Sequence, residues 1–356
     1  MLPVAGLVIS AVLVQAAPAP RDTAPRSRLT VLPVVSYSEV TGVQYGAMVF
    51  RGFRVDRDPA TRSSSLSFYA ARTAKHHAKA YAQLDRWSEA NRAHLRLRVE
   101  HISYPLPFFG VGASTPDSGE EWYSSGVSTA HFYLQRAIRP STFLHGGVRH
   151  VRSRVRDVET GGILAQDALP GSSGSDVITT ELGLVIDSRD NTGSARTGTY
   201  VRALPSIASK VVGSDFVFHR LTIDARRYAV VFSQHVVAAQ LQYDGISGTA
   251  PFDQLPMIGA DTAMRGYPRG RFRDQHAVTA QAEVRTAPWR RVGAVAFAGA
   301  GTVASAFSKF ARERWYPTAG VGLRYVLSPR ERTVLRADLG FGRGSFGINV
   351  GIGEAF

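Results

Sequence analysis

Hydrophobic and polar residues alternate with a period of two along most of this chain. Clear examples are residues 94–100, 220–226, 278–285 and 335–339. Successive side chains of a β-strand point to opposite faces, so this alternation predicts strands with one apolar and one wet face. No apolar run reaches the roughly 20 residues that a membrane-spanning helix needs. The pattern therefore indicates an all-β protein.

The alternating segments number sixteen. They are predicted at 29–38, 43–55, 63–74, 77–87, 93–103, 121–138, 142–158, 177–188, 199–211, 216–230, 235–246, 276–287, 291–303, 318–327, 333–341 and 346–356. A soluble β-sandwich has the same period, with its polar face in water. An even strand count, with short and long connections in alternation, favours an outer-membrane barrel, whose closure satisfies every backbone group in lipid. We predict a 16-stranded antiparallel transmembrane β-barrel.

The connections also predict an orientation. If the first strand runs outward, the long connections at 104–120, 159–176, 247–275 and 304–317 all lie outside the cell. The short proline-containing turns then lie in the periplasm, as in bacterial outer-membrane barrels. The turns at 56–62 and 188–198 are the exceptions, because they are long for the inner side.

The first residues differ from the rest. Residues 2–14 form an apolar run, which is followed by Gln15-Ala16-Ala17-Pro18. An apolar run before small residues is typical of a secretory signal peptide. We predict a signal peptide at 1–16, a short periplasmic leader at 17–27 and the barrel at 28–356.

Composition and charge exclude several classes of function. The chain has 42 Lys and Arg residues against 28 Asp and Glu residues, a net charge of +14. These charges are scattered singly between apolar residues, which suits a wet interior better than a nucleic-acid face, and we expect no nucleic-acid partner. Cysteine is absent, which excludes disulfides and thiolate metal sites. Serine and histidine residues form no catalytic or metal-binding motif, so we expect no enzyme activity, metal or cofactor.

Four segments resemble the barrel domain of the BamA/TamA family, also called the bacterial surface antigen domain. They are PVVSYSEVTGVQYGA (33–47), LGLVIDSRDNTGSARTGTYVRA (182–203), GADTAMRGYPRGRFRDQ (259–275), and AGVGLRY (319–325) with LRADLGFG (335–342) and the closing strand. They occur in the family's order and cover nearly all of the chain after the leader. The resemblance implies an outer-membrane barrel whose long loop folds into the lumen.

The resemblance implies that an ion pair, here called the lock, holds that loop against the inner wall. In the family the arginine of an Arg-Gly-Phe/Tyr motif contacts the inner wall, and here the motif is Arg265-Gly266-Tyr267. A buried guanidinium needs a carboxylate, and Glu283 lies on the inward face of the next strand. The family's aspartate on the thirteenth strand is Gly299 here, which predicts a looser lock or help from Asp338. The alternative is an arginine-rich surface loop held by nothing.

Two further places are candidate sites. The resemblance implies a periplasmic turn built on Asp187, Arg189, Asp190 and Gly198. The closing strand contains Gly347, Gly351 and Gly353 and ends at Phe356. Glycine weakens a strand, so these residues predict a weak seam between the first and last strands. They equally fit a crowded lumen beside the folded-in loop.

The resemblance implies assistance in inserting or translocating proteins, or lipid, across the outer membrane. Partners would be outer-membrane lipid, client proteins and separate periplasmic partner proteins, since only a short leader precedes the barrel. The alternative is a passive channel or structural barrel without an assembly role. Its lumen would favour anions through inward-facing arginines, namely Arg96, Arg98, Arg220, Arg226, Arg285, Arg324 and Arg336.

Overall fold

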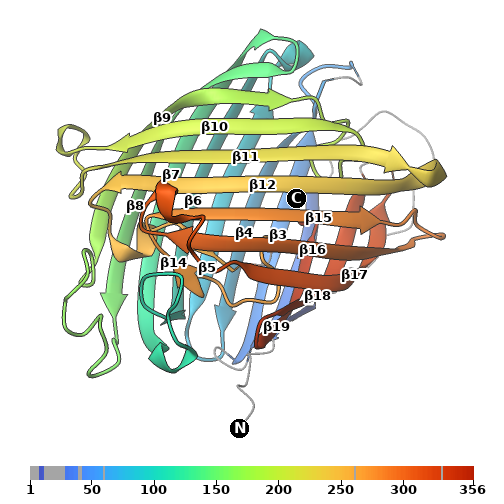
Figure 1. Cartoon of the computed structure of the whole chain (residues 1–356). Coiled ribbons are helices and arrows are strands. Elements are labelled where there is room, and N and C mark those ends of the chain that lie inside the picture. Colours follow the sequence, from blue (N-terminus) through green and yellow to red (C-terminus); the bar gives the residue numbers. More distant parts are fainter. Residues whose placement is uncertain (1–7, 12–28, 39–41, 59–60, 260–261, 330–331) are drawn as a thin grey trace.

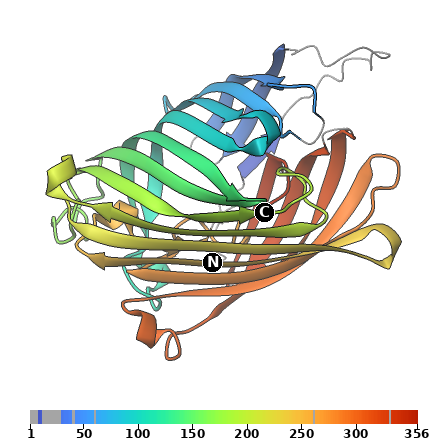
Figure 2. The ribbon, with the colours of Figure 1, turned by 90° about the horizontal axis from the view of Figure 1, so that it is seen from above.

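The protein is described by a computed structural model that covers residues 8–11, 29–38, 42–58, 61–259, 262–329 and 332–356. The expected leader at 17–27 and most of the expected signal peptide lie outside these residues. Sixteen long antiparallel strands, β2–β12 and β15–β19, form the wall, which confirms the predicted fold class. Figures 1 and 2 show them curving around a central space, with the first strands (blue) beside the last (red).

The strand bounds follow the chain in order. The first eight long strands are β2 (Leu29–Ser38), β3 (Gly42–Phe53), β4 (Ser64–Thr73), β5 (Ala78–Trp87), β6 (Ala93–Phe108), β7 (Glu121–Arg139), β8 (Thr142–Arg156) and β9 (Ser175–Asp187). The other eight are β10 (Gly198–Ala208), β11 (Phe218–Val231), β12 (His235–Gly248), β15 (His276–Arg285), β16 (Val292–Ala304), β17 (Tyr316–Ser328), β18 (Thr333–Gly342) and β19 (Ser345–Ile352).

Shorter elements occur outside the wall strands. Three are two- to four-residue strands, namely β1 (Val8–Ala11), β13 (Met257–Ile258) and β14 (Phe272–Arg273). The described chain also has the 3-10 helices η1 (Glu89–Asn91), η2 (Asp117–Gly119), η3 (Lys210–Val212), η4 (Phe232–Gln234), η5 (Phe252–Gln254) and η6 (Phe307–Lys309). Among the described residues, no helix has the length and hydropathy to cross a membrane.

Antiparallel pairing runs from strand to strand around the wall. Each long strand pairs with the next one in the chain from β2 to β19, and β12 pairs directly with β15. Within the described residues no pairing register joins β19 to β2. Strand β1 pairs with β2 through Val8↔Ser38 to Ala11↔Val35 and also contacts β19. The two ends of the wall therefore meet at a junction that contains an added strand.

Side chains alternate across the wall as the sequence pattern predicts. Large apolar residues on the outer face are exposed, including Phe68, Leu97, Val99, Phe132, Val148, Leu182, Leu184, Leu241, Val321 and Leu323. Charged residues on the inner face are buried, including Asp85, Asp224, Glu283, Arg285, Arg324, Arg336 and Asp338. This arrangement is the reverse of that in a soluble protein, and it suits a wall with lipid outside and polar groups inside.

Two predicted strand ends differ from the observed ends by more than three residues. The strand predicted at 93–103 continues to Phe108, although Pro105 and Pro107 lack N–H donors. Strand β5 pairs with β6 only as far as Ser103, so one side of the β6 extension needs no donor. The strand predicted at 346–356 ends at Ile352, because Gly353 turns the chain at φ 87°.

The connections differ at the two ends of the wall. The end that carries the connections after β6, β8, β10, β12 and β16, at the left in Figure 1, is here called the long-loop end. The opposite end is called the short-turn end. The longest connection, residues 249–275 between β12 and β15, contains β13 and β14 and is called the plug loop. Its buried residues Ile258, Met264, Tyr267 and Phe272 form an apolar cluster with Ala277, Val303 and Tyr316 of the wall and Ala113 of the connection after β6.

Candidate functional site

The plug loop is held by a buried ion-pair group. Arg265 is completely buried, and its guanidinium donates to Glu283 Oε2 on β15 and to Asp338 Oδ2 on β18, each at 2.8 Å. The same guanidinium lies 3.5 Å from the centre of the Phe297 ring on β16. A charge in a water-excluded site is stable only when other charges and hydrogen bonds compensate it. The two acids and the ring compensate the charge of Arg265, whereas its buried Nε has no hydrogen-bond partner among the described residues.

The two carboxylates belong to a larger network on the inner wall. Glu283 Oε1 accepts from Arg285 Nε at 2.6 Å, and Asp338 Oδ1 accepts from Arg324 Nη1 at 2.5 Å. Arg324 also donates to Glu354 at 2.7 Å. Each acid of the lock thus keeps a second cation, so the plug loop joins an existing network of charges.

The loop backbone comes unusually close to β18. Gly266 has φ 111°, and a Cβ there would lie 2.7 Å from the carbonyl carbon of Phe341. A Cβ on Gly340 would lie 2.6 Å from the Arg265 carbonyl group. Gly266 needs glycine for both its left-handed backbone and its close approach to β18, and Gly340 needs glycine for the close approach. These two positions therefore set how deeply Arg265 is buried. The Gly266 carbonyl also accepts from Ser345 Oγ at 2.7 Å.

Tyr267 completes the contact with the wall. Its hydroxyl donates to the Pro317 carbonyl at 2.8 Å and accepts from the Arg343 N–H at 2.7 Å. Burial, together with the nearby Tyr316, raises the pKa of Tyr267 to about 12. The phenol therefore stays a neutral donor at any physiological pH.

The looser lock that Gly299 suggests does not describe this arrangement. Gly299 stands opposite Gln281, where a Cβ would lie 2.9 Å from the Gln281 Cβ. The second carboxylate comes from Asp338 on β18 instead. The guanidinium consequently has two acids and an aromatic face, without an acid on β16.

The plug loop also contacts the long loops. Arg271 donates to Asp117 Oδ1 at 2.6 Å and to the Thr115 carbonyl at 2.8 Å in the connection after β6. Gly112 N–H donates to the Arg273 carbonyl at 2.8 Å. These contacts cover the lumen at the long-loop end. They were not predicted, because the partners lie about 150 residues apart in sequence.

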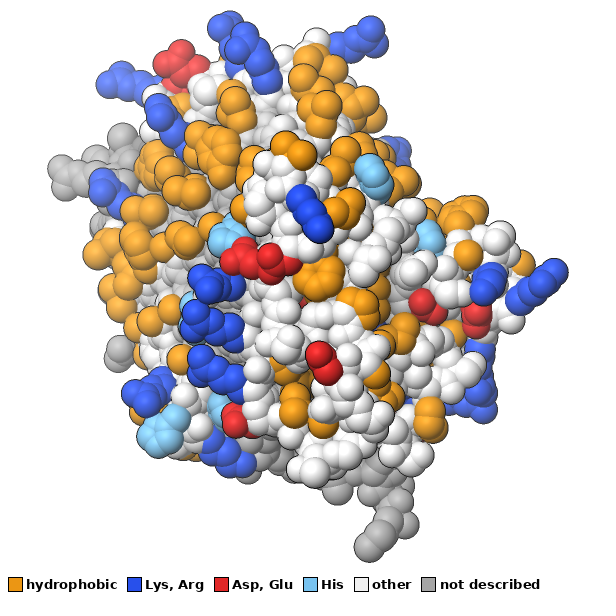
Figure 3. Space-filling view, turned by 90° about the vertical axis from the view of Figure 1, so that its left-hand side faces the viewer, with side chains coloured by type: hydrophobic (Ala, Val, Ile, Leu, Met, Phe, Trp, Pro, Cys, Tyr) orange, Lys and Arg blue, Asp and Glu red, His pale blue; other side chains and the backbone are white. Residues whose placement is uncertain are grey.

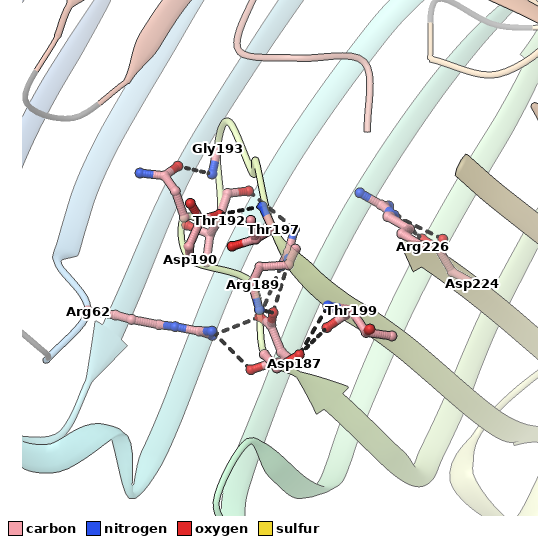
Figure 4. Close-up of polar contacts among 12 residues, drawn as sticks. Arg62, Asp187, Arg189, Asp190, Thr192, Gly193, Thr197, Thr199, Asp224 and Arg226 are labelled. Carbon is pink, nitrogen blue, oxygen red and sulfur yellow. Dashed lines mark hydrogen bonds and ion pairs between the residues drawn. The ribbon is translucent and has the colours of Figure 1, made fainter. Parts of the chain in front are cut away.

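At the short-turn end, the turn between β9 and β10 (residues 188–197, the inner turn) folds around charged contacts (Figure 4). Asp187 accepts from Arg189 at 2.8 Å and 3.0 Å and from Arg62 at 2.7 Å. Gly198 has φ 105°, and a Cβ there would lie 2.3 Å from the Ser188 carbonyl oxygen. Of the four predicted turn residues, the structure therefore brings Asp187 and Arg189 into direct contact and gives Gly198 a backbone role.

Asp190 holds the middle of the inner turn. Its Oδ1 accepts from the N–H groups of Arg196 at 2.9 Å and Thr197 at 3.2 Å, and its Oδ2 pairs with Arg332. Burial by itself would raise the pKa of Asp190, but the hydrogen bonds from Arg332 and the two N–H groups hold that pKa below its ordinary value. Asp190 is therefore ionised at neutral pH and ties the inner turn to the turn before β18.

The last four residues, called the tail (353–356), enter the lumen instead of extending β19. The Phe356 ring is buried in a cluster with Ala195 of the inner turn and Tyr228 of β11. The Phe356 carbonyl oxygen accepts from Arg285 at 2.8 Å. Gly353 and Phe356 are therefore not seam residues in this structure.

Gly347 and Gly351 do lie in β19, on its inward side. A Cβ on Gly347 would lie 3.7 Å from Gly266 of the plug loop, and one on Gly351 would lie 3.2 Å from Arg336 Nε. Gly351 thus lies in a crowded part of the lumen, as the alternative explanation proposed, whereas a Cβ on Gly347 would make ordinary van der Waals contact. Weakness of the seam stays a prediction.

A cavity of about 710 Å³ remains in the lumen, lined by the inner faces of β4–β12, the inner turn and Gln254 of the plug loop. The arginines predicted to line the lumen have acid partners, and the pairs are Arg96–Asp85, Arg98–Glu100, Arg220–Asp244, Arg226–Asp224, Arg285–Glu283, Arg324–Asp338 and Arg336–Asp338. Six acids serve these seven guanidiniums, and Glu283 and Asp338 also pair with Arg265, so the pairing reduces the positive field of the lumen without cancelling it. Arg149 and Arg202 line the cavity as well, and the anion-favouring pore stays an alternative.

A sixteen-stranded wall with apolar residues outside, ion pairs inside and a long loop locked in the lumen defines an outer-membrane β-barrel. Residues 52–356 match the Omp85 superfamily domain, and the chain belongs to this superfamily. The predicted resemblance to BamA and its relatives is thereby confirmed. No curated protein matches the chain in sequence.

Two solved structures have a similar fold. BamA from Haemophilus ducreyi, in a form lacking POTRA domains 1–3, aligns with a TM-score of 0.60 and 15% identity over 92% of this chain and 69% of that one. CdiB from Acinetobacter baumannii aligns with a TM-score of 0.53 and 14% identity over 94% of this chain and 62% of that one. At these identities the comparison concerns the fold alone.

Proposed function

We propose that this barrel assists the insertion or translocation of other proteins, or of lipid, at the outer membrane, and that it acts through the junction between β19 and β2. The observation that carries the proposal is the edge of β2 at that junction, which no described wall strand covers. Residues 8–11, part of the predicted signal peptide that is removed from the mature chain, pair with this edge in place of an incoming extended segment. An edge that accepts one extended segment has the unpaired N–H and C=O groups needed to accept another.

The plug loop lies next to this junction. Gly266 approaches β18, and its carbonyl accepts from Ser345, the first residue of β19. Asp338, which pairs with Arg265, lies on β18. Release of Arg265 would therefore loosen β18 and β19, the last two strands of the wall, of which β19 borders the junction. This coupling supports a barrel whose sideways opening depends on whether the plug loop is docked.

The partners belong to the proposal as well. Clients would be unfolded outer-membrane proteins, whose strands could extend the β2 edge by backbone hydrogen bonding. The short-turn end would receive them, with the help of separate periplasmic proteins. No bound nucleotide is needed, because strand pairing supplies the driving force.

A crosslink across the junction tests this function. The chain has no cysteine, so Val35→Cys on β2 and Ile348→Cys on β19 can be joined by a bis-maleimide that spans about 10 Å, two strand spacings. The barrel is placed in proteoliposomes with a urea-denatured eight-stranded outer-membrane protein, and the yield of protease-resistant product is measured over time. We expect the barrel to accelerate folding and the crosslink to abolish the acceleration.

The matched control joins Leu339 to Ile348, which already face each other across the β18–β19 pair. This crosslink should leave the acceleration intact. A barrel that gives no acceleration, or one that keeps it after the Val35–Ile348 crosslink, would contradict the proposal. In the first case, steady ion conductance with anion selectivity would support the passive channel instead.

A further inference from the structure

The outer face of β4–β8 changes character toward the long-loop end. Strand register places outward residues in rows across the wall, and the row Leu84–Leu97–Phe132–Val148 is apolar. The next row is Ala82–Val99–Ala130–His150, followed by Ala80–His101–Ser128–Arg152. The row after these is Arg72–Ala78–Ser103–Gly126–Arg154. An apolar band therefore gives way within three rows to small and basic side chains.

Three arginines form a ladder on the outer face of β8. Arg152, Arg154 and Arg156 are exposed, whereas Val151 before them and Ser153 between the first two are buried on the lumen side. Arg152 lies 3.8 Å from Asp176 on β9, but neither Arg154 nor Arg156 makes a hydrogen bond or ion pair with another described residue. Two guanidiniums at the edge of the apolar band are thus available to a partner outside the protein.

A shallow groove lies beside this ladder. Its volume is about 510 Å³, and its floor consists of short side chains such as Ala80, Ala82, Ser128 and Ala130. Arg72 and Arg154 stand on either side of the rows above it, four strand spacings or about 19 Å apart. A ligand that fills this surface needs an apolar part toward the band and anionic groups toward the arginines.

Figure 3 looks onto the long-loop end and shows Lys and Arg side chains gathered around its rim, next to hydrophobic side chains of the outer wall. Among the described residues, the carboxylates near the ladder include Asp176, which pairs with His150 at 2.5 Å, and Asp215, which accepts from the Asp176 N–H at 3.0 Å. Exposed Asp157 directly follows Arg156 in the chain. The face keeps an excess of positive charge where a lipid headgroup would lie.

We infer that this surface, namely Arg152, Arg154 and Arg156 with the neighbouring groove and Arg72, binds the phosphorylated headgroup of an outer-leaflet glycolipid. The inference depends on the barrel spanning the outer membrane with its long-loop end outside, and it does not require any assembly activity. Guanidinium groups bind phosphate through paired hydrogen bonds, and the small side chains leave room for sugar rings and the start of the acyl chains. A protein or nucleic-acid partner fits less well, because the basic rows continue directly into lipid-facing residues.

The test uses the full chain in detergent and bisphosphorylated lipid A as the probe, with bound lipid counted by native mass spectrometry. Arg154→Gln with Arg156→Gln removes the two unpaired charges and should weaken binding about thirtyfold. The control is Arg136→Gln with Arg139→Gln, which removes two exposed charges from the other end of neighbouring strand β7. This control should bind as the parent chain does.

Two further probes identify the ligand chemistry. Dephosphorylated lipid A should bind weakly, and phosphatidylglycerol should fail to compete at equal concentration. Equal binding of dephosphorylated lipid A, or unchanged binding by the Arg154/Arg156 variant, would overturn the inference. Equal competition by phosphatidylglycerol would overturn it in favour of a general attraction to anionic lipid. The Arg154/Arg156 variant should still accelerate client folding, so this result and a failure of the proposed function are separable.

Discussion

Replacing Arg265 with alanine tests the lock most directly. The change removes the guanidinium that lies 2.8 Å from both Glu283 and Asp338. Breaking a buried ion pair from one side costs about 3–5 kcal/mol, because the remaining charge keeps its desolvation penalty. Here Glu283 keeps Arg285 and Asp338 keeps Arg324, so we expect a cost near the lower limit, about 3 kcal/mol.

This cost falls on the docking of the plug loop, because the wall strands remain paired without it. A loss of about 3 kcal/mol lowers the equilibrium constant for docking about a hundredfold. The assay is hydrogen exchange of plug-loop amides in proteoliposomes, combined with ion conductance in a planar bilayer. Protection of residues 262–275 should fall by a similar factor, and conductance should rise as the lumen opens.

Arg269→Ala is the matched control, because Arg269 lies in the same loop and is exposed. It should exchange and conduct like the parent chain. Unchanged protection and unchanged conductance in Arg265→Ala would refute the reasoning, since the loop would then be held by its apolar contacts alone.

Three other changes test the remaining contacts. Gly340→Ala places a Cβ against the Arg265 carbonyl and should cost about 1–3 kcal/mol, seen as faster plug-loop exchange, whereas Gly126→Ala, which meets no atom within 4 Å, should have no effect. Equal exchange in the two variants would contradict the close approach. Asp190 has a lowered pKa, so its pairing with Arg332 stabilises the inner turn above the ordinary Asp pKa of about 3.9 and is lost as the pH falls through its lower folded value. Proteolysis of that turn between about pH 6 and pH 3 should depend less on pH in Asp190→Asn, and an identical profile would exclude this contribution. Phe356→Ala empties a buried position and should cost about 3 kcal/mol in thermal unfolding, whereas an unchanged midpoint would mean that the tail adds no stability.

The wall could be predicted from the sequence because residues of each strand alternate between apolar side chains facing lipid and polar side chains facing the lumen. β2 was predicted with its observed bounds of 29–38, and most other ends differ by one to three residues. The exceptions depend on neighbours. The extension of β6 past Ser103 needs β7 as a partner, and the tail leaves the wall because Phe356 finds a buried position among residues distant in sequence.

The site was only partly accessible to sequence analysis. Arg265 and its two acids followed from a motif, an inward strand face and the need to compensate a buried charge. The contact of Arg271 with Asp117 carries no periodic signal, because both residues lie in loops. The pairing of residues 8–11 with β2 was not predicted, since these residues were assigned to the signal peptide.

The spacing of the lock along the chain has a consequence for how this protein reaches the membrane. Asp338 follows Arg265 by 73 residues, so the pair forms only after β15, β16, β17 and β18 have all been delivered. Until then the arginine lacks its second acid, and the plug loop lacks one of the ion pairs that hold it in the lumen. The Arg265–Asp338 ion pair therefore forms late in biogenesis, and docking of the plug loop is completed only once β18 is in the wall.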